Sequence, residues 1–219
     1  MFTRDDLARV AAIAVAHDLL VLADEVWGEL MLPAAAGDDR EFVSMASLLG
    51  EVPGLRERLI VVSSPSKAFN VAGLNLAWAY VPDRDLRRAF VSAGKDKAEL
   101  GTFGVVALKA AYAEGEPWRQ RLVEYVAANR DRAAAALDAG APELRYTVPD
   151  ASYLMWIDCR ALGEKSPATF FERAGVGFSD GATFGARGFV RLNLACTAAT
   201  IDAIVERVVA AVAAGRGAP

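Results

Sequence analysis

The chain has 219 residues, 54% of them hydrophobic, so it can bury a sizeable core in one large domain or two small ones. Lysine and arginine number 24 against 28 aspartates and glutamates, a net charge of -4 with no basic block, which argues against a nucleic-acid-binding protein or a polybasic membrane patch. We therefore expect partners among small molecules and other proteins, with no nucleic acid and no membrane.

The few sulfur and imidazole groups argue against a metal centre. Cys159 and Cys196 lie far apart without a Cys-x-x-Cys spacing, which favours reduced, packed thiols in a cytosolic protein over a disulfide framework or a zinc site. His17 is the single histidine, so a histidine-based metal cluster is excluded and no metal site is expected. The apolar stretch 10–16 lacks the flanks of a signal peptide and the length of a membrane span, so we expect a cytoplasmic protein.

The order of hydrophobic patterns along the chain predicts an α/β fold. Thr3 is a candidate N-cap for the first helix, and two short apolar runs then indicate parallel strands covered on both faces. Strands are predicted over 19–23, 59–62, 76–81, 153–159 and 189–195. Helices are predicted to about 16, then over 84–93, 103–113, 118–139 and 168–174, and from about 200 onward.

These elements divide into two parts joined by the long helix. The first, residues 1–115, is an α/β portion with about three strands, whereas typical sheets have about five or six. The second, residues 116–219, is a smaller α/β portion. Something that should cover the first sheet is therefore expected to be absent from this chain.

Unusual residues follow the first two strands, where ligands of open α/β sheets bind. Asp24 ends the first strand and Lys67 closely follows the second; by itself, such a pair is better explained as a plain ion pair than as a functional site. Ser64 and Ser66 add hydroxyl donors, and Gly73 removes a side chain where the backbone must approach something closely. A lysine partly removed from water there becomes a usable amine nucleophile, suited to a Schiff base.

The predicted strand near the end of the chain has one apolar and one polar face. By two-residue alternation, Val190, Leu192 and Leu194 share one side and Arg191 and Asn193 the other. Arg191 can make a surface ion pair, or its guanidinium can bind a substrate carboxylate through two parallel hydrogen bonds. The pattern alone leaves both open.

Five segments, taken in order, resemble one enzyme family. They are ADEVWGEL, SSPSKAFNVAGL, FGVVALKAAYAEGEPW, ASYLMWIDCRALG and GFVRLNLAC. They resemble the fold-type-I enzymes that depend on pyridoxal 5'-phosphate (PLP), and among these the class I/II aminotransferase branch with the MalY/PatB-type cystathionine β-lyases. The resemblance implies a three-layer α/β/α PLP-binding large domain, of which residues 1–115 form the remaining part with an incomplete sheet. Residues 116–219 would form a small α/β C-terminal domain.

The resemblance also implies roles for the residues after the first two strands. Lys67 would be the catalytic lysine that holds PLP as a Schiff base, and Asp24 would pair with the protonated pyridine nitrogen. Trp27 stands where relatives place an aromatic residue or a histidine near the cofactor ring. Ser64 and Ser66 would contact the phosphate.

The implied activity is a C–S β-lyase that converts a sulfur amino acid to a thiol, pyruvate and ammonia, with Arg191 holding the substrate α-carboxylate. An aminotransferase would use the same residues, and a non-catalytic fragment is a further alternative. The segment Gly73-Leu74-Asn75 lacks the arginine that many aminotransferases carry there, which favours the lyase branch. The family also implies a homodimer.

The main departure from the family is length. Relatives are nearly twice as long, and their first half carries the ring-stacking aromatic residue and part of the phosphate site. We therefore expect a truncated chain that corresponds to the C-terminal half, binds the cofactor weakly by itself and associates through its uncovered sheet.

Overall fold

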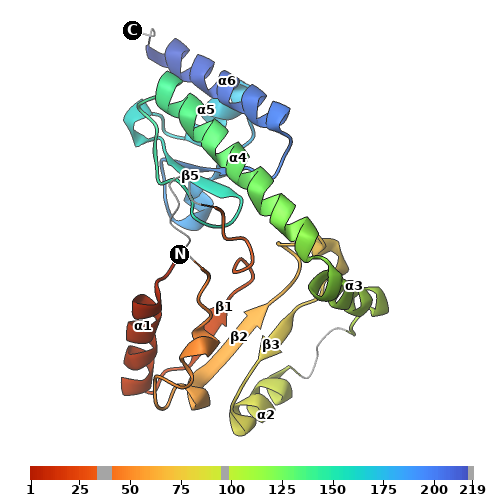
Figure 1. Ribbon diagram of the computed structural model, residues 1–219. Helices are drawn as coiled ribbons and strands as arrows, with labels where there is room; N and C mark the ends of the chain where they lie inside the picture. Colours follow the sequence, from red (N-terminus) through yellow and green to blue (C-terminus); the bar gives the residue numbers. More distant parts are fainter. Residues whose placement is uncertain (34–40, 95–98, 217–219) are drawn as a thin grey trace. The chain divides into compact units, whose positions relative to one another are not determined.

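The computed structural model describes residues 1–33, 41–94 and 99–216 (Figure 1). Helices and sheets are both present, which confirms the predicted α/β class. The chain forms two compact units: unit 1 comprises Met1–Met31 and Arg40–Arg121, and unit 2 comprises Leu32–Asp39 and Leu122–Pro219. As domain assignments, the ranges 1–115 and 116–219 stay a prediction.

Unit 1 contains a three-stranded sheet in the order β1-β2-β3. The strands are β1 (Val21–Asp24), β2 (Leu59–Ser63) and β3 (Trp78–Tyr80). β1 and β2 are parallel, as their unbroken apolar runs predict, and β3 is antiparallel to β2. The carboxyl ends of β1 and β2 therefore lie at the same edge of the sheet.

One face of this sheet is covered by helix α1 (Arg4–Ala16) and the 3₁₀ helix η1 (Met45–Leu48). The predicted N-cap is confirmed, because the Thr3 hydroxyl accepts from the Asp6 amide at 3.2 Å while the Asp6 carboxylate accepts from the Thr3 amide at 3.1 Å. The core on this face consists of buried side chains from both helices, from β2 and from a connecting loop: Ala11, Met45, Leu48, Leu55, Leu59 and Val61.

The rest of the sheet carries apolar side chains that the described chain leaves open. Leu22 of β1 is 65% exposed, and all three residues of β3 are exposed. This agrees with the uncovered apolar surface that the small number of predicted strands implies.

Three helices follow the sheet of unit 1 along the chain. α2 (Arg84–Ala93), α3 (Thr102–Glu114) and α4 (Glu116–Gly140) lie where the sequence predicts them. Gly115 separates α3 from α4, and a Cβ there would lie 2.7 Å from the Phe69 ring, so only glycine allows this close approach.

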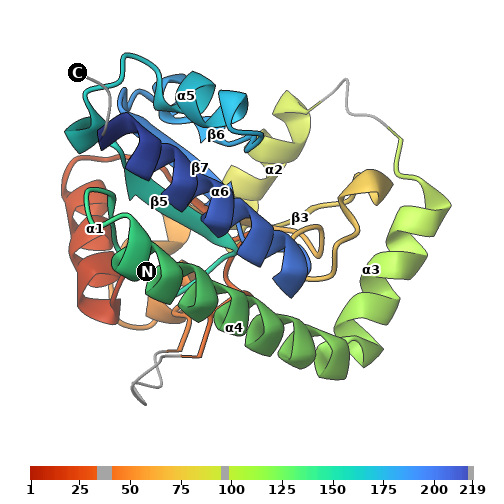
Figure 2. The same ribbon diagram turned by 90° about the horizontal axis from the view of Figure 1, so that it is seen from above.

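Unit 2 contains a four-stranded antiparallel sheet in the order β4-β5-β7-β6. β5 (Leu154–Asp158) and β7 (Phe189–Asn193) confirm predicted strands, whereas β4 (Arg145–Tyr146) and β6 (Ser179–Asp180) were not predicted because two residues make no periodic pattern. The remaining helices are α5 (Pro167–Arg173) and α6 (Ala198–Arg216). Figure 2 shows α4 and α6 side by side.

The core of unit 2 lies between the sheet and its helices. The inward residues of β5 and β7 alternate with more exposed ones, so Val190 and Leu192 are buried while Arg191 and Asn193 lie on the opposite face, as predicted. Among the described residues, no helix is long and apolar enough to span a bilayer.

Candidate functional site

The carboxyl end of β1 presents an oriented carboxylate. Asp24 is the last residue of the strand and is exposed, and its Oδ1 accepts a hydrogen bond from the Val26 amide at 3.1 Å. The chain then turns through Trp27, whose carbonyl accepts from the Leu30 amide at 3.0 Å. Glu25 points toward η1, where its carboxylate accepts from the Ser44 hydroxyl at 3.0 Å.

The carboxyl end of β2 leads into a turn built on serine hydroxyls. Ser64 is buried, and its hydroxyl donates to the Leu76 carbonyl at 2.6 Å and lies 2.5 Å from the Ser66 hydroxyl. The Ser66 amide donates to the Ser64 hydroxyl at 3.0 Å. These contacts fix the segment that leads to Lys67, and they commit the Ser64 proton to the protein.

Lys67 is half-buried and lies beside an aromatic ring. Its Nζ is 5.5 Å from the centroid of the Trp27 ring, a cation–π distance. Among the described residues, Nζ forms no ion pair, so the plain pair with Asp24 that the sequence allowed is not formed. The amine and the carboxylate follow adjacent parallel strands without neutralising each other.

The close approach expected at Gly73 is made by no described residue, because a Cβ there would meet no described atom within 4 Å. The tight glycine is instead Gly104 of α3, where a Cβ would lie 2.9 Å from the Leu74 carbonyl oxygen. The constraint therefore lies on the helix that packs against this segment.

A polar cluster lies beside the strand ends of unit 1. The Trp78 indole donates to the Tyr112 hydroxyl at 3.1 Å, and burial raises the pKa of Tyr112. Burial also raises the pKa of Glu29, against the lowering effect of a hydrogen bond from Tyr112 and of the nearby Arg119. The Arg119 guanidinium donates to the Glu29 carbonyl at 2.6 Å, which ties the start of α4 to the segment after β1.

Arg191 belongs to unit 2, where it lies on β7. Its guanidinium carbon lies 4.5 Å from the Phe184 ring centroid, and its NH2 lies 3.4 Å from the Ser179 hydroxyl. Sequence reasoning missed these two neighbours, because Ser179 lies in a two-residue strand and Phe184 in a glycine-rich loop. Burial raises the pKa of the nearby Tyr153, while the charge of Arg191 lowers it.

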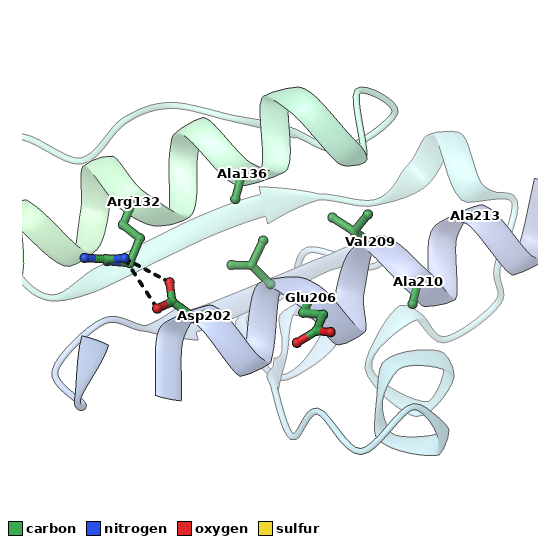
Figure 3. A pocket seen from close by; sticks show the side chains of 8 residues that line it. Arg132, Ala136, Asp202, Glu206, Val209, Ala210 and Ala213 are labelled. Atoms are coloured by element: carbon green, nitrogen blue, oxygen red, sulfur yellow. Dashed lines mark hydrogen bonds and ion pairs between the residues drawn. The ribbon is translucent and has the colours of Figure 1, made fainter. Parts of the chain in front are cut away.

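A shallow groove of about 560 Å³ between α4 and α6 carries none of the predicted site residues (Figure 3). Its charged pair is satisfied, because Arg132 NH1 lies 3.2 Å and 3.4 Å from the two carboxylate oxygens of Asp202. Much of the remaining lining is alanine and valine. The groove has no part in the site predicted from the sequence.

Comparison with known proteins identifies the family. The model of the family "Aminotransferase class I and II" matches residues 1–208, so the chain belongs to this family. The chain is 33% identical over 218 residues to cystathionine beta-lyase PatB of Bacillus subtilis (strain 168), covering 96% of this chain and 54% of that protein. It thus spans about half the length of the curated relatives that it matches.

Two solved structures extend the likeness to the fold. The crystal structure of OvoB has a TM-score of 0.90 and 36% identity, covering 97% of this chain and 54% of that one. Cystalysin from Treponema denticola, whose structure contains PLP, has a TM-score of 0.88 and 25% identity, covering 98% of this chain and 54% of that one. The predicted family and its fold are thereby confirmed.

Proposed function

We propose that this chain carries the PLP lysine and the substrate-carboxylate arginine of a C–S β-lyase that acts on sulfur amino acids. The proposal depends on the arrangement of side chains at the sheet edge where the parallel strands β1 and β2 end. There Asp24 and Lys67 follow adjacent parallel strands and form no ion pair with each other among the described residues. Relatives named as cystathionine beta-lyases support the reaction class.

The residues present fit PLP by their chemistry. Lys67 supplies an amine without a carboxylate partner among the described residues, and the Asp24 carboxylate is exposed and oriented by the Val26 amide. Ser66 and Ser64 supply hydroxyls for the phosphate, although Ser64 would have to exchange the Leu76 carbonyl for a phosphate oxygen. Trp27 offers an apolar ring beside the amine.

When bound, PLP supplies an aldehyde that condenses with amines and a protonated ring that accepts the electrons released at the substrate Cα. The Asp24 carboxylate would favour a proton on the pyridine nitrogen by its negative charge. The Lys67 amine would hold the cofactor and, once released, would take up the substrate Cα proton as general base. Arg191 binds and orients the α-carboxylate through parallel N–H donors.

The reaction test is an elimination assay on the chain loaded with PLP. Cystathionine is the probe, pyruvate and free thiol are measured, and Lys67→Ala is the matched control. Release of both products by the chain, and not by the control, supports the lyase. Transfer of the amino group without thiol release would instead identify an aminotransferase, and bound PLP without either product would identify a non-catalytic fragment.

A second variant tests the role of the carboxylate. Asp24→Asn keeps the shape of the side chain and its acceptor for the Val26 amide but removes the negative charge. We expect PLP still to react with Lys67. The rate of elimination should fall at least tenfold, because loss of the charge lowers the pKa of the ring nitrogen and each pKa unit corresponds to about 1.4 kcal/mol. An undiminished rate would contradict the assignment.

A further inference from the structure

Arg191 is a cation on β7 flanked by residues of both neighbouring strands. In register, it lies opposite Trp156 of β5 and Ser179 of β6. Its Nε is buried and makes no hydrogen bond within the described chain, and its contact with the Ser179 hydroxyl is long, at 3.4 Å. Among the described residues, no carboxylate forms an ion pair with it. A cation that is left with unused in-plane donors favours an anionic ligand.

The partner that the structure gives this guanidinium is an aromatic face. Its central carbon lies 4.5 Å from the centroid of the Phe184 ring. The Phe184 ring in turn makes an edge contact with Trp156, with 5.8 Å between centroids and 83° between planes. Phe184 is 53% exposed, so its ring is open to solvent on one side.

The backbone around Phe184 is built to hold the ring in place. The 3₁₀ helix η5 (Gly181–Phe184) is capped by Asp180, whose Oδ1 accepts from the Ala182 amide at 2.9 Å. Gly185 ends the turn with φ of +80°, a conformation that other residues rarely adopt. A Cβ on Gly181 would lie 2.5 Å from a carbonyl oxygen of β7, so glycine is required there as well.

We propose that Phe184 is a positioning residue for carboxylate recognition by Arg191. An acidic side chain that held this guanidinium would occupy the same N–H donors that a substrate carboxylate needs. The Phe184 ring instead holds the guanidinium through a cation–π contact, with 4.5 Å from the guanidinium carbon to the ring centroid, and this contact brings no carboxylate to the N–H donors. This inference rests on the proposed function, because it takes Arg191 as the group that binds the substrate carboxylate.

The test uses the full chain labelled with 15N-arginine and needs neither PLP nor turnover. The Nε–Hε resonance of Arg191 is assigned by its loss in Arg191→Lys, and acetate is titrated at constant ionic strength as the probe. In Phe184→Leu we expect acetate affinity to fall about twofold to fivefold, the size of a partly exposed cation–π contact. Phe184→Tyr keeps the ring and should bind acetate within about twofold of the parent chain.

The same spectra report the contact between the Phe184 ring and the guanidinium. The Hε proton should move away from its ring-shifted position in Phe184→Leu and keep that position in Phe184→Tyr. Far-UV circular dichroism checks that each variant folds, and Phe184→Met replaces the leucine variant if that one does not. An affinity unchanged in the variant without the ring would overturn the role of Phe184 and leave the proposed function intact. An Arg191 resonance in the parent chain that does not shift as acetate is added would overturn both the role of Phe184 and the proposed function.

Discussion

A buried asparagine on α4 gives a stability prediction whose size follows from two hydrogen bonds. Asn129 is buried, and its Nδ2 donates to the Leu194 carbonyl at 2.9 Å and to the Cys196 carbonyl at 2.8 Å. These carbonyls lie just beyond β7, so the amide anchors the chain that follows Arg191. Asn129→Ala removes two hydrogen bonds of about 1 kcal/mol each and leaves the Leu194 carbonyl unpaired. The free energy of unfolding should therefore fall by about 2–4 kcal/mol.

Asn129→Asp separates loss of the donor from loss of shape. It keeps the volume but points a carboxylate at two carbonyl oxygens, so we expect it to cost at least about 1 kcal/mol more than the alanine variant. The assay is urea unfolding followed by far-UV circular dichroism. The control is Gln120→Ala on the exposed side of the same helix, with an expected cost below about 0.5 kcal/mol. An aspartate variant as stable as the alanine variant would refute the donor assignment.

Three further predictions concern a thiol, a helix cap and the open sheet face. Burial raises the pKa of Cys159 to about 12, so iodoacetamide at pH 8 should label Cys196 first and leave Cys159 unlabelled in the folded chain; equal labelling by mass spectrometry would contradict this. Thr3→Ala should cost about 1 kcal/mol in urea unfolding, and an unchanged midpoint would argue against the capping box. Leu22→Lys should reduce self-association in sedimentation velocity without lowering stability, because its side chain is already 65% exposed; an unchanged sedimentation profile would exclude this face as the cause of association.

The elements with a strong local sequence signal were predictable from the sequence. The parallel pair β1 and β2 follows from two unbroken apolar runs, and the first helix follows from Thr3 and Asp6, whose reciprocal hydrogen bonds the structure contains. The polar face of β7 with Arg191 follows from simple alternation. In each case the pattern involves residues that are neighbours in the sequence, so the sequence alone predicts the element.

Features that depend on contacts between distant residues were not predictable. The ring of Phe184 lies over Arg191 because β6 pairs with β7, and a strand of two residues leaves no period to detect. Gly73 and Gly104 show the same limit, because only the packing of α3 decides at which of these positions a side chain would clash with the backbone. The commitment of the Ser64 proton to the Leu76 carbonyl likewise needs three-dimensional contacts.

The central claim is that the strand ends of unit 1 form a PLP site with Lys67 as its amine. The most direct test mixes the chain with PLP, reduces it with borohydride and locates the adduct by peptide mass mapping, with Lys67→Ala as control. We predict one adduct per chain, on Lys67, and none above background in the control. Adducts spread over exposed lysines such as Lys109 and Lys165, with no preference for Lys67, would contradict the claim.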